Sequence, residues 1–395
     1  MLAFFKDPRA VALLLAASLT ILSNTIISPA LPGLQASFPD NPNAELMTRL
    51  LVTAPSLLVA FFAPFAGMVA DRFGRRRQIL VGALLFSVAG CAGTILPSLE
   101  TILVSRLFLG LSVAMVMTGQ AALIGDYFDG EARGKFMGLQ IAVVNFSGFA
   151  FIALSGWLAG MSPRLPFLIY ALGAVIFPYL WFTVKDPVAK ASAGPEVAGE
   201  NAGSAGWVLT LVVIVTLSAL SFVLFYLVPT QIPFYLATIG FDSASDPAQV
   251  LAMVTLAGGA TALAFGRIHA RLGHGLTPAC GFLFMACGFG LLDWVHSMAL
   301  IDLAALCIGA GFGLTMPTFF AVALDAAPAQ HRGLVSGAIT TSIFLGQFIS
   351  PIFSMPMVGA IGYEGTFGVA AIILVVTAVL VYLFFQRRGR STVPA

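Results

Sequence analysis

The sequence predicts an all-α membrane protein whose twelve transmembrane helices form two six-helix bundles in a parallel repeat. Composition is the first reason, because 59% of the 395 residues are hydrophobic, 9% are charged and the mean hydropathy is +0.98. Too little polar side chain remains to cover a water-soluble globule, so we expect lipid to be the solvent. The second reason is a series of long apolar segments, and the third is an internal repeat between the two halves of the chain.

Apolar segments of membrane-spanning length recur along the whole chain. A span needs about 20 mostly apolar residues to cross roughly 30 Å of hydrocarbon, and long runs without alternating polarity favour helices over barrel strands. In the first half we expect spans at 10–31, 48–70, 78–97, 101–125, 134–160 and 167–184. In the second half we expect them at 207–235, 249–265, 276–295, 300–323, 333–358 and 367–385. The first segment follows Lys6 and Arg9 as a signal peptide would, but its length and the further spans identify it as the first helix.

Lys and Arg residues predict the orientation of the spans, because cytoplasmic loops carry an excess of positive charge. With both termini in the cytoplasm, 16 of the 19 basic residues lie on the cytoplasmic side, Arg49 and Arg164 lie outside, and Arg106 lies within a span. The formal net charge of +2 therefore reflects membrane topology and does not indicate a nucleic-acid partner. We expect a multi-pass protein of a bacterial inner membrane.

The chain divides into two halves, 1–184 and 207–395, joined by a segment of different composition. Residues 185–206 (KDPVAKASAGPEVAGENAGSAG) are rich in Ala, Gly, Ser, Glu and Lys, which is typical of a flexible cytoplasmic linker. An offset of 199 residues aligns the halves through the pairs Gly67/Gly266, Arg72/Arg271, Gly74/Gly273, Gly82/Gly281, Gly110/Gly309, Asp126/Asp325, Arg133/Arg332, Gly134/Gly333 and Gly138/Gly337. Chance explains some glycine pairs, but it does not readily place Asp, Arg and Gly together at one spacing. Six spans per unit give both units one orientation, which is the parallel repeat of rocking carriers.

The loop after the second predicted span reads GMVADRFGRRR, from Gly67 to Arg77. A topology anchor explains its arginines, but it does not explain the glycine spacing, the single acid or the weaker copy GRIHARLG that begins at Gly266. The loop resembles the signature G-x-x-x-D-R-x-G-R-R of the major facilitator superfamily, and the matching residues are Gly67, Asp71, Arg72, Gly74, Arg75 and Arg76. The resemblance extends through the spans, the linker and the repeat. It implies a two-bundle carrier in which this loop pairs with Asp126 as an ionic latch between gating states.

Arg106 lies well inside the fourth predicted span, where a charge is costly unless it is paired or faces water. Snorkelling toward the outer interface, or a structural hydrogen-bond clamp, is the alternative to a functional role. Arg106 and Gly110 resemble the R-x-x-x-G motif in the fourth helix of proton-linked members of the superfamily. That resemblance implies a role for Arg106 in proton coupling or substrate binding.

Two departures from the drug/proton antiporter pattern limit the assignment. The fifth helix of such antiporters carries G-x-x-x-G-P-x-x-G-G, whereas Gly148, Gly156 and Gly160 stand here without a Gly-Pro pair. The first helix has only neutral polar groups where many multidrug antiporters have a carboxylate. Acidic residues near the predicted outer ends are expected to be solvated, and among them Asp302 is the first candidate for proton coupling.

Neutral polar residues within the spans are candidates for a substrate cavity, although interhelical hydrogen bonding is the commoner role of a single polar side chain. Among them are Gln120 and Gln140. We expect substrate binding at Asn24, Arg106, Asn145, Tyr226, Gln231 and Gln347. The resemblance implies that the first and seventh helices face the centre. Since Pro229 and Pro233 flank Gln231, we also expect a kinked seventh helix whose freed carbonyls bind substrate.

The sequence lacks the motifs of an ATP-driven pump or an enzyme. It has no G-x-x-x-x-G-K-[ST] phosphate loop, no H-E-x-x-H spacing and no paired acids or serine–base set at one depth. We therefore expect no enzyme activity, no cofactor and no metal. The cysteines fall within predicted spans without metal-ligand spacing and are expected to be buried thiols, namely Cys91, Cys280, Cys287 and Cys307.

Together these features predict a monomeric secondary transporter that works by alternating access, with protons, the lipid bilayer and a small-molecule substrate as partners. The first hypothesis is proton-coupled efflux of small amphipathic organic compounds, as in multidrug exporters. The alternative is a proton symporter or uniporter for a metabolite, siderophore or organic anion, with Arg106 as the anion contact. A receptor built on a carrier fold would need neither the gating loop nor the repeat.

Overall fold

The computed structural model describes residues 4–186, 206–294 and 296–391, and within these ranges the chain is helical without β-strands. The elements before the predicted linker are η1 (Phe4–Lys6), α1 (Pro8–Thr25), η2 (Ser28–Ala30), α2 (Leu31–Ala36), α3 (Ala44–Phe73), α4 (Arg75–Cys91), η3 (Ala92–Thr94), α5 (Leu99–Tyr127), α6 (Gly130–Met161), η4 (Leu165–Ala171) and α7 (Leu172–Thr183). Those after it are α8 (Trp207–Phe225), α9 (Leu227–Thr238), α10 (Ser245–Trp294), α11 (Met298–Ala326), η5 (Ala329–His331) and α12 (Arg332–Ser391). The predicted linker at 185–206 lies almost entirely outside the described residues.

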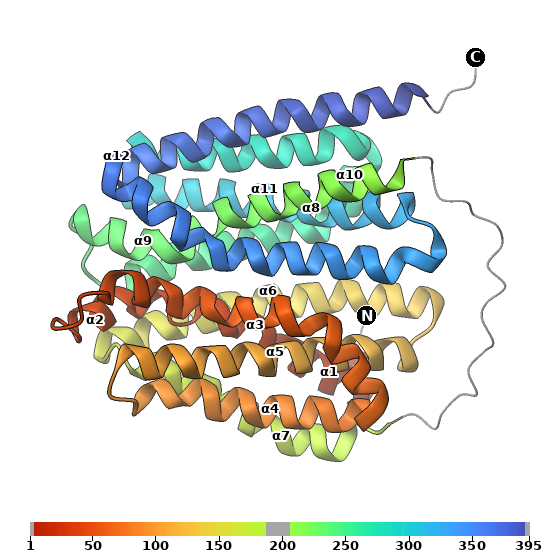
Figure 1. The fold of residues 1–395 in the computed structure, drawn as a ribbon, viewed down its shortest axis with the longest axis horizontal. Coiled ribbons are helices and arrows are strands. Elements are labelled where there is room, and N and C mark those ends of the chain that lie inside the picture. The colour runs from red at the N-terminus through yellow and green to blue at the C-terminus, as the bar shows by residue number, and fades with distance from the viewer. Residues whose placement is uncertain (1–3, 187–205, 295, 392–395) are drawn as a thin grey trace.

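The long helices lie side by side in one bundle, and their ends define two faces (Figure 1). We call the end where α1 begins and α12 ends the terminal face. The turns from α3 to α4 and from α5 to α6 also lie there. The other end, which includes the turn from α2 to α3, is the opposite face.

In the described part of the chain, ten helices are long and apolar enough to cross a membrane. Two of them, α10 with 50 residues and α12 with 60, exceed the length of about 20 residues that one crossing needs. Each contains a glycine with non-helical backbone angles, Gly273 (φ 72°, ψ −175°) and Gly362 (φ 75°, ψ 177°). Glycine adopts a positive φ without the steric cost that other residues incur. The chain reverses direction within α12 (Figure 1).

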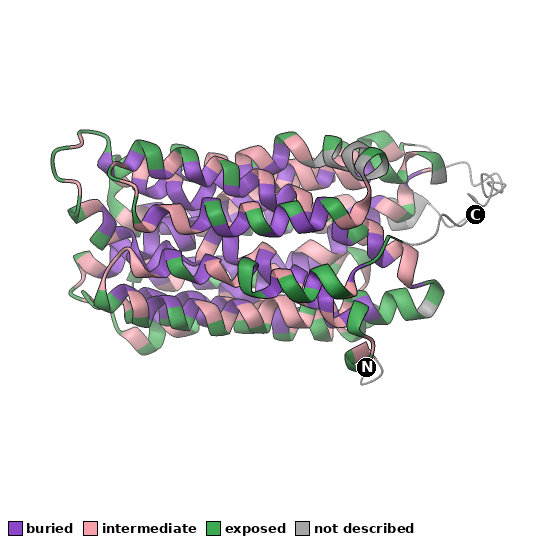
Figure 2. Cartoon of the chain, turned by 90° about the horizontal axis from the view of Figure 1, so that it is seen from below, coloured by how far each residue is buried: buried purple, intermediate pink, exposed green. Residues whose placement is uncertain are grey.

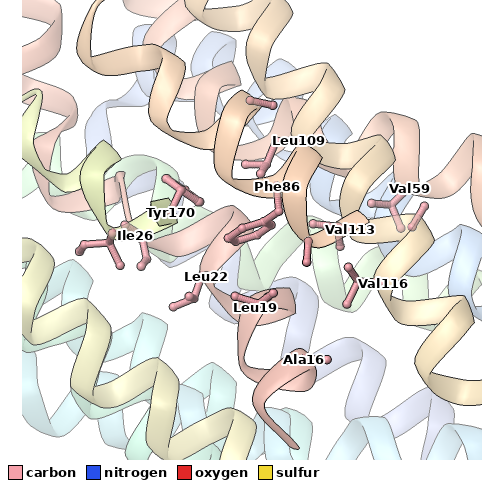
Figure 3. Packing of buried hydrophobic residues seen from close by; sticks show 14 of the residues in the cluster. Ala16, Leu19, Leu22, Ile26, Val59, Phe86, Leu109, Val113, Val116 and Tyr170 are labelled. Carbon is pink, nitrogen blue, oxygen red and sulfur yellow. The ribbon is translucent and has the colours of Figure 1, made fainter. Parts of the chain in front are cut away.

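Buried apolar residues form two clusters that follow the two halves of the chain. One cluster lies almost entirely within residues 10–184, and the other mainly within residues 214–385. In the first cluster Leu19 and its neighbours on α1 pack near Phe86 of α4 and Tyr170 of η4 (Figure 3). Each half therefore has a core of its own.

The outside of the bundle carries large apolar side chains. Figure 2 shows buried residues along the interior and exposed residues along the outer surfaces of the helices. Phe182 is 76% exposed and Val88 is 70% exposed, which suits contact with lipid chains. The expectation of buried thiols is wrong, because Cys287 is exposed and Cys91, Cys280 and Cys307 are only half-buried. Hydropathy alone does not distinguish a helix face turned to lipid from one turned to the core.

Close helix contacts recur at the spacing of the sequence repeat. Gly74 and Gly273, which are 199 residues apart, both have a positive φ. Gly82 and Gly281, separated by the same interval, each lie against the backbone of a neighbouring helix, where an added Cβ would come within 3.2 Å and 2.7 Å of a carbonyl oxygen. The two halves thus have the same backbone conformation or the same close helix contact at equivalent positions.

Candidate functional site

A cavity of about 260 Å³ lies where the two halves of the chain meet. Helices α1, α5 and α6 of the first half and α8 to α12 of the second contribute to its lining. Its apolar wall includes aromatic rings, among which Phe225 and Phe312 stack with centroids 3.9 Å apart and Phe222 meets Phe312 edge-on at 5.0 Å. Its polar lining residues are all uncharged among those described, and they are Thr20, Asn24, Thr25, Asn145, Tyr226, Thr255 and Gln347.

A second cavity of about 430 Å³ adjoins the first, since Thr20 and Met117 line both. It continues between α5 and α6 as far as Arg133, near the start of α6 at the terminal face. Gln140 also lines it, and Gln120 donates a hydrogen bond there to the carbonyl of Leu13 at 2.8 Å. The central cavity therefore extends toward the terminal face.

A polar cluster of Asn24, Ser56, Tyr226 and Gln347 joins the two halves at the cavity. Asn24 Nδ2 lies 2.9 Å from Gln347 Oε1, 3.1 Å from the Tyr226 hydroxyl and 3.3 Å from Ser56 Oγ. Ser56 Oγ donates to the same Gln347 Oε1 at 2.5 Å. An amide nitrogen has two hydrogens, so the surrounding acceptors saturate Asn24 as a donor. Four of the six residues expected to bind substrate line this one cavity, namely Asn24, Asn145, Tyr226 and Gln347.

The seventh predicted span is broken at Tyr226, between α8 and α9, as its prolines predicted. Pro233 has no N–H with which to bond the carbonyl of Pro229. That carbonyl instead accepts a hydrogen bond from Ser28 Oγ in the first half of the chain. The sequence predicts that freed carbonyls bind substrate. The Pro229 carbonyl instead connects the two halves of the chain through Ser28, on the side of the cavity nearer the opposite face.

Arg49 forms a second connection between the halves near the opposite face. The residue is 1% exposed, and its guanidinium donates to Gln231 Oε1 at 2.9 Å, to the Tyr363 hydroxyl at 3.1 Å and to the carbonyl of Glu45 at 2.9 Å. Its Cζ also lies 3.9 Å from the ring centroid of Phe234. We call Arg49, Gln231, Phe234 and Tyr363 the opposite-face clamp. Gln231 therefore does not line the cavity.

The sequence did not identify Arg49 as a functional residue. The distribution of basic residues places Arg49 outside the membrane, although it falls inside the span expected at 48–70. The sequence shows only a single arginine at the beginning of an apolar helix. From the sequence alone, a solvated arginine at such a position cannot be distinguished from a buried one.

Arg106 is fully buried within the first half and does not line the central cavity. Its Nη2 donates to the Tyr170 hydroxyl at 3.1 Å, and its Cζ lies 4.5 Å and 4.8 Å from the ring centroids of Tyr170 and Phe167. Within the described part of the chain, its Nε and Nη1 have no hydrogen-bond partner. The aromatic rings around the guanidinium resemble a structural clamp more than a contact with substrate.

Asp302 is half-buried near the start of α11 at the opposite face. Its Oδ2 accepts a hydrogen bond from Gln249 Nε2 at 2.5 Å, whereas its Oδ1 is buried and has no hydrogen-bond partner among the described residues. Asp302 is thus separate from the central cavity.

The predicted gating loop lies at the terminal face, where Gly74 (φ 90°) forms the turn between α3 and α4. Arg75 forms an ion pair with Asp126 at the end of α5, and the backbone N–H of Arg76 donates to Asp186 Oδ1 at 2.8 Å. The sequence missed Asp186, which gives no local signal at the edge of the linker. Arg72 is exposed, whereas the surroundings of Gly67 and the side chain of Asp71 are outside what the structure describes.

Residues 13–351 match the family model of the Major Facilitator Superfamily. The chain is similar to "Multidrug resistance protein 1" of Bacillus subtilis, with 28% identity over 85% of this chain and 88% of that protein. "Quinolone resistance protein NorA" of Staphylococcus aureus is 33% identical over 37% of this chain and 38% of its own length. Among solved structures, a D-xylose-proton symporter superposes with a TM-score of 0.79 at 16% identity, covering 95% of this chain and 97% of the symporter.

Proposed function

The chain belongs to the Major Facilitator Superfamily and is a transporter, and from that premise we propose that it exports small amphipathic organic compounds by proton-coupled alternating access. The observation that carries this proposal is the central cavity, whose wall is apolar and aromatic and whose described polar groups are all uncharged. Such a lining favours a ligand that has a large apolar surface and few polar groups. The names of the two bacterial relatives, which refer to drug resistance, support the same reading.

We propose twelve membrane spans, because Gly273 and Gly362 divide α10 and α12 into two segments of spanning length each. Six spans then lie in each half, with residues 1–184 and 207–395 as bundles and 185–206 as the connection. The terminal face carries Arg72, Arg75 and Arg76, so the positive-inside rule favours a cytoplasmic terminal face, with both termini inside a bacterial inner membrane.

The conformation supports an inward-facing state in this orientation. Ser28 bonds Pro229 and Arg49 bonds Gln231 between the cavity and the opposite face, while the second cavity leads toward the terminal face. Alternating access then requires the opposite-face clamp to break when the outside opens, and the Arg75–Asp126 pair of the terminal face to respond in the same cycle.

We propose Asp302 as the proton carrier. The described lining of the central cavity contains no carboxylate, whereas Asp302 Oδ1 is buried and no described residue forms a hydrogen bond with it. Gln249 donates a hydrogen bond to Asp302 Oδ2. Protonation of Oδ1 would therefore remove an uncompensated negative charge from the helix bundle near the opposite face. Arg106 contacts aromatic rings, and we assign it to positioning of the first half.

The alternative of an organic-anion carrier is disfavoured by the same geometry. An anion in the cavity would need a nearby cation, because burying an unpaired charge is costly. Arg106 was the expected anion contact, and it lies outside the cavity lining. We propose that the functional unit is a monomer, since the cavity is formed within one chain.

Reconstituted vesicles test the proposal directly. The purified protein is placed in liposomes that contain a pH-sensitive dye, and an inward or outward pH gradient is imposed before a fluorescent amphipathic dye is added. Export by antiport predicts that substrate and protons move in opposite directions, and that a protonophore abolishes accumulation. Movement of both in one direction, or uptake that ignores the gradient, would contradict antiport. Liposomes without protein provide the control for passive leakage.

A further inference from the structure

We infer that the central cavity selects neutral compounds that carry a carbonyl-type hydrogen-bond acceptor on an aromatic or apolar body, and that Gln347 and Tyr226 supply the donors. This inference rests on the proposed function, because it names the substrate class of the same cavity. It derives from the hydrogen-bonding capacity that the protein leaves unused at that cavity.

The amide of Gln347 is held in one orientation. Its Oε1 accepts from Asn24 Nδ2 at 2.9 Å and from Ser56 Oγ at 2.5 Å. With Asn24 Nδ2 as the donor, reversal of Gln347 alone would set its amide nitrogen against the Asn24 amide nitrogen, where both groups are donors. The Gln347 Nε2 is consequently turned away from the polar cluster.

Gln347 Nε2 has no partner in the described part of the protein, although the residue is only 5% exposed and lines the cavity. Gln347 Nε2 also differs from Arg106 Nε and Nη1, which lack a hydrogen-bond partner among the described residues but have almost no solvent-accessible surface. A buried amide without partners is unfavourable by itself, so a ligand that accepts from it gains affinity.

The Tyr226 hydroxyl is a second donor. It accepts from Asn24 Nδ2 at 3.1 Å, so its own hydrogen remains available to the cavity that Tyr226 lines. The threonines of the lining are not equivalent, because Thr20, Thr25 and Thr255 donate to carbonyls of their own helix. Asn145 Nδ2 donates to the carbonyl of Ile141 at 2.9 Å, on its own helix. The donors of Gln347 and Tyr226 belong to the second half, and both are oriented by Asn24 of the first.

The absence of charge among the described lining residues determines the type of acceptor. A carboxylate would accept from the same two donors, but its charge would remain uncompensated in the cavity. A ketone or amide carbonyl satisfies both donors without that cost. The stacked rings of Phe225 and Phe312 provide the surface for the apolar body.

Equilibrium dialysis tests the inference with the full-length protein in lipid nanodiscs and empty nanodiscs as the control for partitioning into lipid. The probes are N-methylacridone, its methylene analogue N-methylacridan, and the anionic N-carboxymethyl derivative of acridone. We expect wild-type protein to bind the acridone roughly tenfold tighter than the acridan, and the anion more weakly than the neutral acridone.

Two variants remove one donor each. Gln347→Glu retains the oxygen that accepts from Asn24 and Ser56 but replaces the amide nitrogen, and Tyr226→Phe removes the hydroxyl. Either change should lower the acridone-to-acridan affinity ratio to about threefold or less. Gln386→Glu makes the same chemical change at an exposed position of α12, where Nε2 donates to the Tyr382 hydroxyl at 3.2 Å, and should leave the ratio as in wild type.

Equal binding of acridone and acridan by wild-type protein, binding of neither, tighter binding of the anion, or an unchanged ratio in both variants would overturn the inference. Transport of the same probes is measured separately in vesicles. Export of the acridan together with an affinity ratio near one would leave the proposed function standing and refute the donor assignment. Selective binding of the acridone without transport would refute the proposed function instead.

Discussion

Arg49 of α3 and Gln231 of α9, 182 residues apart in the chain, are joined by a hydrogen bond of 2.9 Å that crosses between the two halves. Gln231 is held in turn by Ser354, whose Oγ accepts from its Nε2 at 2.7 Å. Both Arg49 and Gln231 are buried. An ionised donor makes such hydrogen bonds stronger than neutral ones, so this contact is well placed to hold the opposite face closed.

Arg49→Ala should open the opposite face. Loss of hydrogen bonds from a charged donor weakens the closed state by about 1.5–3 kcal/mol each, which shifts the equilibrium roughly tenfold or more. Spin labels at Asp40 and Ser243, exposed positions of the two halves at that face, report the change in a background whose native cysteines are replaced. We expect a longer distance to become populated in double electron–electron resonance measurements, together with slower transport.

Arg164→Ala is the matched control, because the Arg164 side chain donates only to carbonyls of its own half, at Thr94 and Leu96, among the described residues. Its distance distribution should match that of the parent protein. An unchanged distribution in Arg49→Ala would show that the clamp does not hold the closed face.

Much of the fold follows from the sequence because each cue is local or periodic. Span length gives the helices, and the 199-residue offset gives the pairing of the halves, which the positive φ of Gly74 and Gly273 repeats in the backbone. Side-chain direction is not contained in a hydropathy average. Cys287 illustrates this, since it falls in an apolar span and yet lies on an exposed helix face.

The site was predictable where a polar residue occupies the middle of a central span, as Asn24 and Tyr226 do. It was not predictable where the environment depends on how the two halves meet. Arg49 is buried by Tyr363 and Gln231, which come from distant segments and contribute no signal near position 49. Arg106 shows the converse, because a motif named the residue while its aromatic neighbours from η4 direct it away from the cavity.

Asp126→Asn should slow transport by roughly twofold to fivefold, since it removes the ion pair with Arg75 at the terminal face. The two side chains are 24% and 31% exposed, so solvent screens the pair and its contribution is about 0.5–1 kcal/mol. Initial rates in vesicles measure the effect. The exchanged pair Arg75→Asp with Asp126→Arg should recover part of the loss, and Asp40→Asn at the exposed opposite face should have none. Failure of the exchange together with wild-type rates in Asp126→Asn would exclude the latch.

Asp302→Asn should separate substrate movement from the proton gradient. The amide preserves the size of the side chain and a carbonyl oxygen for Gln249 Nε2, but it cannot bind and release a proton. We expect gradient-driven accumulation to fall about tenfold or more while exchange of labelled for unlabelled substrate continues. Asp242→Asn, at an exposed position of the same face, is the control. Accumulation that still follows the pH gradient in Asp302→Asn would assign the proton to another group.

Arg106→Lys should lower thermal stability without changing the relative affinities of different substrates. The ammonium cannot reproduce the stacking of the planar guanidinium between Phe167 and Tyr170, and it remains in a fully buried site. The melting temperature and the ratio of KM values for two substrates distinguish the roles. A changed KM ratio at unaltered melting temperature would instead indicate contact with substrate.

Gly110→Ala should destabilise the first half through a direct clash. An added Cβ at Gly110 would lie 2.1 Å from the carbonyl oxygen of Pro55, and the equivalent Cβ at Gly309 would lie 2.1 Å from that of Val254. Overpacking of this kind costs about 1–3 kcal/mol, and here the neighbour is backbone that has little room to move. Gly110→Ala and Gly309→Ala should lose melting temperature in thermal unfolding monitored by size-exclusion chromatography. Gly134→Ala should match or exceed wild type, because an added Cβ there meets no described atom beyond its own stretch of helix within 4 Å and alanine favours helix. Equal melting temperatures for all three variants would mean that α5 does not approach α3, and α11 does not approach α10, as closely as the backbone contacts imply.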